Sequence, residues 1–186
     1  MERYTSVQQE ILNECSNALS RIEEEPTEQL LRAILTADTV FFTGVGRVLL
    51  SLKSVCKRFN HLGITACYVG EVREPAITQN DLLIVASGSG ESVIPITVAK
   101  KAKHLGVTIA LIGSNPHSTL SEMADLFVRI PVQTKLGLKD ELCSRQPMTS
   151  LFEQCVLLYG DALAKMIVER KRLDMAALWQ YHANLE

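Results

Sequence analysis

The chain has 186 residues, of which 47% are hydrophobic and 22% charged, a length and balance that argue against a disordered, collagen-like or repeat protein. A formal net charge of −2 gives no general attraction for polyanions, so we expect no sequence-independent nucleic-acid binding. Any anion must therefore be bound by a local site. We expect one domain over residues 1–186, because domains of this size are common and bury a substantial core.

The cysteines and the terminal segment bear on the compartment. The five cysteines are odd in number and contain no Cys-x-x-Cys pair: Cys15, Cys56, Cys67, Cys143 and Cys155. This pattern disfavours a disulfide framework and a structural zinc site. Neither a basic-then-apolar leader nor an apolar run of about 18 residues is present. We therefore expect a protein of the reducing cytoplasm that does not enter membranes.

Two helices are predicted at the start of the chain. Apolar residues recur at helical spacing over residues 5–22, which predicts an amphipathic helix. Pro26 suits a first helical position, and the apolar residues that follow it predict a second helix that ends at the turn Ala37-Asp38. We expect these N-terminal helices to occupy residues 5–37.

Five short apolar runs bounded by Gly, Asp or Asn then predict strands: Thr39–Thr43, Thr65–Val69, Leu82–Ala86, Thr108–Ile112 and Leu126–Ile130. Their hydrophobicity is continuous rather than alternating, which is typical of parallel strands covered on both faces. Helices are expected between them: Arg47–Leu62, Glu91–Leu105 and Thr119–Ala124. The sequence thus predicts an α/β fold, a three-layer α-β-α arrangement whose mainly parallel sheet of about five strands fills residues 38–131.

The C-terminal part is predicted to be helical after a loop. Residues 136–148 are polar and weakly patterned, so we expect a loop there. From Leu151 to Met166 a wide apolar stripe predicts a helix that is buried against the sheet or another subunit. A short helix is expected over Asp174–Tyr181, which places the C-terminal helices within residues 147–186.

The strongest candidate for chemistry is the loop after the third predicted strand: Ser87, Gly88, Ser89, Gly90, Glu91 and Ser92. The glycines permit a tight turn in which amide groups converge on one anion, while the start of the next helix and the serine hydroxyls add further donors. Carboxyl ends of parallel strands are also where such folds bind ligands. The alternative is an ordinary turn with a serine cap, although a cap needs only one serine. No Walker lysine follows.

Three further residues have a functional and a purely structural interpretation. Gly46 and Arg47 close the first strand, and Arg47 suits either a phosphate or developing oxyanion, or a structural carboxylate. Glu153, beside an apolar stripe, suits either a partly desolvated general base or a glutamate that stabilises the helix dipole. His182 is either a proton carrier or a solvated terminal histidine. The other histidines have no ligand spacing, so we assign no metal.

Taken together, these motifs resemble the sugar isomerase (SIS) domain family. Gly-Val-Gly-Arg follows the first predicted strand and Ser-Gly-Ser-Gly-Glu-Ser the third. Further stretches are similar to the 6-phospho-3-hexuloisomerase subfamily: Asn60-His61-Leu62-Gly63, Val69-Gly70-Glu71, Gln146-Pro147-Met148, Ser150-Leu151-Phe152-Glu153-Gln154 and His182-Ala183-Asn184-Leu185-Glu186. The resemblance spans nearly the whole chain and implies a flavodoxin-like sheet, a homotetramer or dimer, and no cofactor.

The resemblance also implies an activity and site roles. Such enzymes interconvert 3-hexulose 6-phosphate and fructose 6-phosphate through an enediolate. Ser87, Ser89 and Ser92 would bind the phosphate with the amides of Gly88 and Gly90. Glu153 would move the proton, and His182 would assist from a neighbouring subunit.

Two departures from the family pattern bear on the substrate. Val48 replaces the usual serine after Gly-Arg, and Thr149 replaces a glycine before Ser150. Valine donates no hydrogen bond, and threonine disfavours glycine-type backbone angles. An isomerase of another phosphosugar, or a non-catalytic sugar-phosphate sensor, is therefore the alternative.

Overall fold

The computed structural model describes residues 3–148 and 150–185, and its centre is one five-stranded sheet. The strands are β1 (Val40–Thr43), β2 (Ala66–Tyr68), β3 (Leu82–Ser87), β4 (Thr108–Gly113) and β5 (Leu126–Arg129). They lie in the order β2-β1-β3-β4-β5, and every adjacent pair is parallel. Each residue of β1 and β3 is buried, as expected of central strands covered on both faces.

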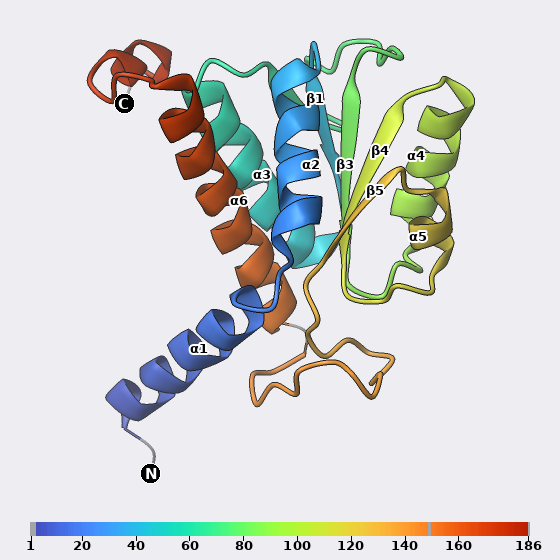
Figure 1. Cartoon of the computed structure of the whole chain (residues 1–186), viewed down its shortest axis with the longest axis vertical. Helices are drawn as coiled ribbons and strands as arrows, with labels where there is room; N and C mark the ends of the chain where they lie inside the picture. The colour runs from blue at the N-terminus through green and yellow to red at the C-terminus, as the bar shows by residue number, and fades with distance from the viewer. Residues whose placement is uncertain (1–2, 149, 186) are drawn as a thin grey trace.

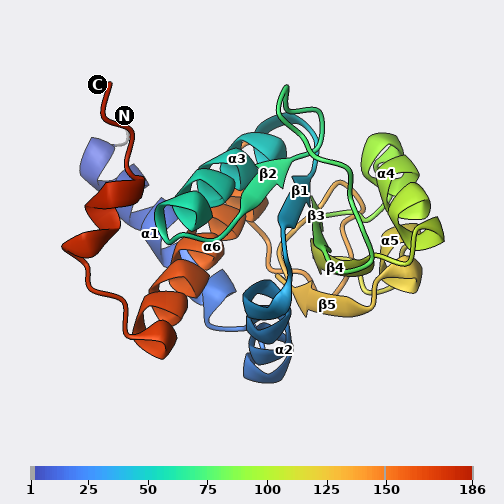
Figure 2. The same ribbon diagram turned by 90° about the horizontal axis from the view of Figure 1, so that it is seen from above.

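Helices cover both faces of the sheet and extend beyond it. They are α1 (Tyr4–Leu19), α2 (Glu24–Thr36), α3 (Gly46–His61), α4 (Val93–His104), α5 (Thr119–Met123), α6 (Ser150–Lys171) and the 3₁₀ helix η1 (Ala177–Tyr181). Figures 1 and 2 show α2, α3 and α6 on one side of the sheet and α4 and α5 on the other. The predicted three-layer α/β fold is confirmed. None of the helices within the described residues is long and apolar enough to span a bilayer.

Most predicted elements are present, with shifted ends. The first helix stops at Leu19 rather than at Ile22, and α2 begins at Glu24, so Pro26 is its third residue rather than its first. Proline is tolerated there because the amides of a first helical turn have no partner within the helix. The expected short helix at Asp174–Tyr181 is a 3₁₀ turn that starts at Ala177.

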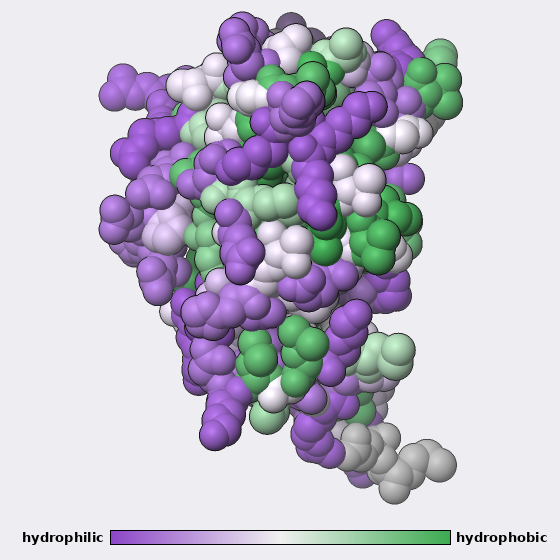
Figure 3. Space-filling view, turned by 90° about the vertical axis from the view of Figure 1, so that its right-hand side faces the viewer, coloured by the Kyte–Doolittle hydropathy of each residue, from purple (hydrophilic) through white to green (hydrophobic). Residues whose placement is uncertain are grey.

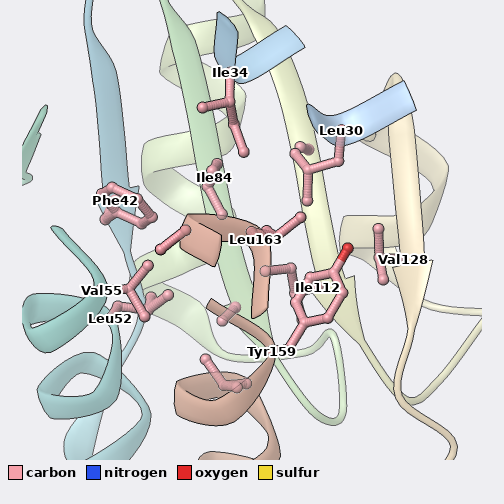
Figure 4. Packing of buried hydrophobic residues seen from close by; sticks show 14 of the residues in the cluster. Leu30, Ile34, Phe42, Leu52, Val55, Ile84, Ile112, Val128, Tyr159 and Leu163 are labelled. Carbon is pink, nitrogen blue, oxygen red and sulfur yellow. The ribbon is translucent and has the colours of Figure 1, made fainter. Parts of the chain in front are cut away.

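The larger core lies between the sheet and the α2, α3 and α6 layer. In Figure 4, Leu30 and Ile34 of α2 and Tyr159 of α6 lie against the sheet, close to Ile84 and Ile112. The helices α3 and α6 approach closely, because Gly160 leaves room for Val55: a Cβ at position 160 would lie 2.2 Å from a Val55 methyl carbon. This packing fixes the start of α6 relative to the loop that precedes α3.

The strand order determines where a ligand can bind. After β1 the chain crosses to β2, and after β3 it crosses to β4 on the opposite side. The helices that follow, α3 and α4, therefore lie on opposite faces of the sheet (Figure 2). The loops after β1 and β3 diverge at their carboxyl ends and leave a crevice, the usual ligand position in open parallel sheets.

Candidate active site

A cavity of about 530 Å³ occupies this crevice. Its wall is formed by the loop after β1, the loop after β3, residues 134 and 135 beyond β5, and the start of α6 with the residues just before it. The volume is within the range of about 300–1,000 Å³ that is typical of small-molecule sites. Of the residues named from sequence, it brings together Gly46, Arg47, Ser87, Gly88, Ser89, Ser92 and Glu153.

The loop of residues 87–92, here called the cradle, is held by its carbonyl groups. The amides of Ser114 and Asn115 both donate to the carbonyl oxygen of Gly88 at 3.1 Å, and the amide of Leu120 donates to that of Gly90 at 3.2 Å. The Asn115 side chain donates to the carbonyl of Ser89 at 3.3 Å. With its carbonyls tied to the chain beyond β4, the cradle has a fixed shape before any ligand arrives.

The serine hydroxyls of the cradle lie at the cavity. Ser87 Oγ and Ser92 Oγ are 3.4 Å apart, and Ser87 Oγ accepts the amide of Gly90 at 3.2 Å. Ser92 immediately precedes α4, yet its side chain does not cap that helix. The cap interpretation therefore does not explain Ser92. Its hydroxyl and the first amides of α4 are arranged as donors for an anion.

Gly90 lies behind the cavity and cannot be replaced without strain. Its φ is +69°, and a Cβ there would lie 2.0 Å from Ser118 Oγ. Only glycine combines that backbone angle with so close a neighbour. The role of Gly90 in the structure is to let the cradle turn tightly against the segment before α5.

Glu91 connects the cradle to α5 rather than facing a ligand. Its carboxylate accepts the amide of Thr119 at 2.7 Å and the Thr119 hydroxyl at 2.8 Å. These two hydrogen bonds lower the pKa of Glu91, and the Lys135 ammonium lowers it further. The carboxylate thus stays ionised and keeps the cradle anchored.

Glu153 combines burial with a charged partner. The residue lies in the first turn of α6 and is 5% exposed. Its Oε1 accepts a hydrogen bond from Nε of Arg47, whose own side chain is 72% exposed. Ser51 of α3 donates to the Glu153 carbonyl at 2.8 Å, which fixes the backbone. A buried carboxylate at a ligand-sized cavity can accept a proton from a carbon acid, and the exposed guanidinium can turn toward a substrate oxygen.

The loop beyond β5 supplies residues that the sequence analysis missed. Thr134 and Lys135 line the cavity, and the Thr134 methyl would lie 3.2 Å from a Cβ at Gly88. The loop is irregular, as predicted, but it reaches back over β4 to the cradle. A polar pair shortly after the last strand was the available signal, since carboxyl ends of parallel strands share one edge of the sheet.

His182 lies elsewhere in the chain. It packs against His61, with ring centroids 5.0 Å apart, and against Trp179, near the far end of α6. Figure 1 shows this C-terminal segment at the end of α6, whereas the cavity is lined by residues at the start of α6. At 1.5 Å per residue the fifteen residues of helix between Glu153 and Val168 span about 22 Å. Within one chain, His182 and Glu153 are not brought together.

Only one of the two departures from the family pattern lies within the described residues. Val48 lines the cavity, so an apolar side chain lies where the family pattern has a serine hydroxyl. Thr149 and Glu186 lie outside the described residues. Among the residues that are described, no cluster of three or more His, Cys, Asp or Glu side chains could hold a metal ion, and all five cysteines are free thiols.

A parallel sheet in this order, with a serine- and glycine-rich cradle at its switch point, defines an α/β protein with a candidate anion-binding site. The chain belongs to the SIS domain family, which it matches over residues 33–158. A 3-hexulose-6-phosphate isomerase of Bacillus subtilis is 41% identical over 177 residues, which cover 95% of this chain and 96% of the relative. One of Mycobacterium gastri is 35% identical, covering 95% of this chain and 88% of the relative.

A solved structure agrees with these relatives. A Methanococcus jannaschii protein, whose structure was reported to infer 3-hexulose-6-phosphate isomerase function, is 29% identical and superimposes with a TM-score of 0.84. The match covers 97% of this chain and 99% of that one. The chain is thus an enzyme of the sugar-phosphate isomerase class.

Proposed function

We propose that this protein interconverts 3-hexulose 6-phosphate and fructose 6-phosphate in the cavity between the cradle and the start of α6. The observation that carries the proposal is the buried Glu153 carboxylate, which lines the same ligand-sized cavity as the cradle serines. The relatives named 3-hexulose-6-phosphate isomerase, at 41% and 35% identity over nearly the full chain, supply the substrate.

We assign the phosphate group to the cradle. The hydroxyls of Ser87, Ser89 and Ser92 donate to phosphate oxygens, with the amides near Gly88 and the first turn of α4. Gly90 provides the turn that the cradle needs. At the other side of the cavity, the positive φ of Gly46 lets the chain turn into α3, with Arg47 beside the sugar.

We assign the proton transfer to Glu153. The carboxylate removes the proton from C2 of 3-hexulose 6-phosphate, and the electron pair of that C–H bond forms the C2–C3 double bond of the enediolate. The protonated Glu153 then returns the proton to C3, and the proton of the C2 hydroxyl passes to the C3 oxygen, so that C2 carries the carbonyl and C3 the hydroxyl. No oxidant or reductant is needed. Arg47 stabilises the oxygen on which negative charge develops.

The direct test is turnover. Purified protein is incubated with 3-hexulose 6-phosphate, and a coupled assay measures fructose 6-phosphate. Turnover supports the proposal. Turnover only of another ketose or aldose phosphate would mean that the enzyme acts on that substrate instead. Val48 would then be the first residue to examine. Thermal stabilisation by fructose 6-phosphate without any turnover would favour the non-catalytic sensor.

We further propose that the enzyme assembles as a homotetramer or dimer in the cytoplasm. The helix α1 extends away from the body of the molecule (Figure 1) and exposes Tyr4, Val7 and Leu12. Figure 3 views the α4 and α5 side, where apolar patches lie among hydrophilic side chains. We favour α1 and the C-terminal segment, which exposes Trp179 and Leu185, as the contact region. Light scattering tests the assembly.

In such an oligomer we propose that His182 serves the site of a neighbouring subunit. A mixing experiment tests this: chains carrying Glu153→Gln and chains carrying His182→Ala are co-expressed and purified as mixed oligomers. A site that takes Glu153 from one chain and His182 from the other is intact, so activity returns above that of either variant alone. Absence of any return would contradict a shared site.

A further inference from the structure

The cavity contains two cationic side chains, and their situations differ. Arg47 and Lys135 are the only cations in its lining, which belongs entirely to the described residues. Arg47 is already paired with Glu153, at the end of the cavity where the carbon chemistry is proposed. A sugar phosphate brings a charge of about −1.5 to −2 at neutral pH. The cradle itself offers hydroxyls and amides but no full positive charge.

The backbone beside Lys135 is held rigidly by a buried carboxylate. Glu141, which is 7% exposed, accepts the amide of Thr134 at 3.1 Å and the Thr134 hydroxyl at 2.9 Å. It also accepts the amide of Leu138 at 2.9 Å and the hydroxyl of Ser114 at 3.1 Å. Since Ser114 also donates its amide to Gly88 of the cradle, one hydrogen-bonded unit joins this loop to the cradle.

Backbone hydrogen bonds also join the two ends of this loop. The amide of Gln133 donates to the carbonyl of Leu142, and the amide of Leu142 donates to the carbonyl of Pro131, both at 2.8 Å. The residues on either side of Lys135 are therefore fixed at both ends of the loop. The Lys135 side chain itself is exposed, so it starts from a defined position and is free to reach a ligand.

The Lys135 charge acts on the cradle. Within residues 3–148 and 150–185 no carboxylate forms an ion pair with it, whereas Lys103 and Arg129 each have one. Its ammonium is nevertheless close enough to Glu91 of the cradle to favour the ionised carboxylate. A lysine that faces the cradle without an ion-pair partner is placed to bind an anion there.

We propose that Lys135 is a substrate-binding residue that contacts the phosphate group of the ligand in the cradle and closes it from the side of the loop. This assignment rests on the proposed function and refines it by giving the phosphate its one full countercharge. It also gives the two cations different roles. Lys135 binds the phosphate, while Arg47 pairs with Glu153 and stabilises the negative charge that develops on a sugar oxygen.

A phosphate contact has a kinetic signature that differs from that of a catalytic group. The phosphate stays the same in substrate, enediolate and product, so its binding is lost equally from the ground state and the transition state. Removing the contact raises KM and leaves kcat nearly unchanged. A lysine that acted on the enediolate oxygen would instead lower kcat.

The experiment compares Lys135→Met with Lys139→Met, which removes an exposed lysine of the same loop that does not line the cavity. We expect Lys135→Met to raise KM by about 10- to 100-fold, the loss typical of a hydrogen bond to a charged group. Lys139→Met should leave KM within about twofold, and Lys135→Arg should recover most of the affinity because it keeps the charge.

A second readout needs no turnover. Inorganic phosphate and fructose 6-phosphate are titrated into each variant, and the midpoint of thermal unfolding is followed. Stabilisation should need about 10-fold or more higher ligand in Lys135→Met than in Lys139→Met. This result supports the inference even if the wild-type protein turned over no hexulose phosphate. Equal ligand dependence and equal KM in the two variants would overturn it, as would a loss confined to kcat.

Discussion

The two ends of α6 carry cavities of nearly equal size, about 530 Å³ at Glu153 and about 520 Å³ near His182. At the first end, polar groups from several segments converge, and Glu153, Ser87 and Ser89 are buried. At the second, apolar side chains form the floor, and the surrounding charges are paired at the surface, as Arg58 is with Asp161 at 3.5 Å. Trp179 there is 71% exposed.

A cavity of suitable volume is therefore not enough to define a site. What distinguishes the Glu153 end is that its polar groups are held by other buried groups, so their positions are fixed before a ligand binds. At the His182 end the charged groups form ion pairs at the exposed surface. Matched changes at the two ends test this difference.

Removing the carboxylate charge at each end gives the sharpest contrast. Glu153→Gln should lower kcat by about 10²–10⁴-fold, the usual contribution of a positioned base, while stabilisation by fructose 6-phosphate persists. Glu169→Gln at the other end loses only a surface pair with Lys165, and its kcat should stay within about twofold. Steady-state kinetics of both variants decide the comparison, and similar kcat values would contradict it.

Two glycines with positive φ test how tightly each end is packed. Gly90→Ala adds a methyl group against Ser118 and should lower the free energy of unfolding by about 2–4 kcal/mol, from backbone strain and overpacking together. Gly63→Ala at the other end has φ +73°, but its methyl group meets the ring of Tyr181, which is partly exposed and can move. It should lose only about 1–2 kcal/mol. Urea unfolding measures both.

The same pair should differ in ligand binding. Gly90→Ala distorts the cradle, so stabilisation by inorganic phosphate should fall markedly, whereas Gly63→Ala should keep it. Equal phosphate responses after correction for stability would show that the cradle geometry is not the anion site.

Glu14 of α1 tests the attachment of the loop that precedes α6. Its carboxylate accepts the Ser144 hydroxyl at 2.6 Å, the amide of Arg145 at 2.9 Å and the Gln146 side chain at 3.0 Å. Partial burial raises the pKa of Glu14, but these hydrogen bonds outweigh it, so its pKa lies below the ordinary 4.5. Glu14→Gln should cost about 0.5–1.5 kcal/mol at pH 7, allowing for partial exposure.

The pH dependence of that cost follows from the sign of the shift. Because the folded-state pKa is lowered, the stabilisation is fully present above pH 4.5 and is lost as the pH falls through the folded-state value. The stabilities of the wild-type protein and Glu14→Gln should therefore begin to converge as the pH falls below 4.5. A constant difference down to about pH 3 would mean that the carboxylate charge has no part in holding the loop.

The rates at which the cysteine thiols react provide a further test of how the core is packed. Burial raises the pKa of Cys56 to about 11 and those of Cys67 and Cys155 to about 12, whereas Cys143 in the loop before α6 is exposed. A thiol reagent at about pH 8 should modify Cys143 first, and Cys143→Ser should remove the fast phase. A second fast thiol would indicate that the core around that buried cysteine is less tightly packed than in the structure.

The fold and part of the site were predictable because they depend on local patterns. Continuous apolar runs mark strands buried on both faces, and helical spacing marks the covering helices, so the sheet and its layers followed from the sequence. The cradle was also recognisable, since Gly90 and the serines lie within six residues and each has a known local effect. Element ends were less certain: the first turn of α2 tolerates Pro26 in more than one position.

The rest was decided by contacts between residues far apart in the chain. Nothing local indicates that Arg47 pairs with Glu153, 106 residues away, or that Ser114 joins Glu141, 27 residues away, to the cradle. These contacts exist because parallel strands bring their carboxyl ends to one edge, which only the strand order establishes. From the sequence alone, the cradle serines and Glu153 were predicted as candidates for binding phosphate and for moving a proton. The tertiary structure decided which of them meet, and it left His182 at the other end of α6.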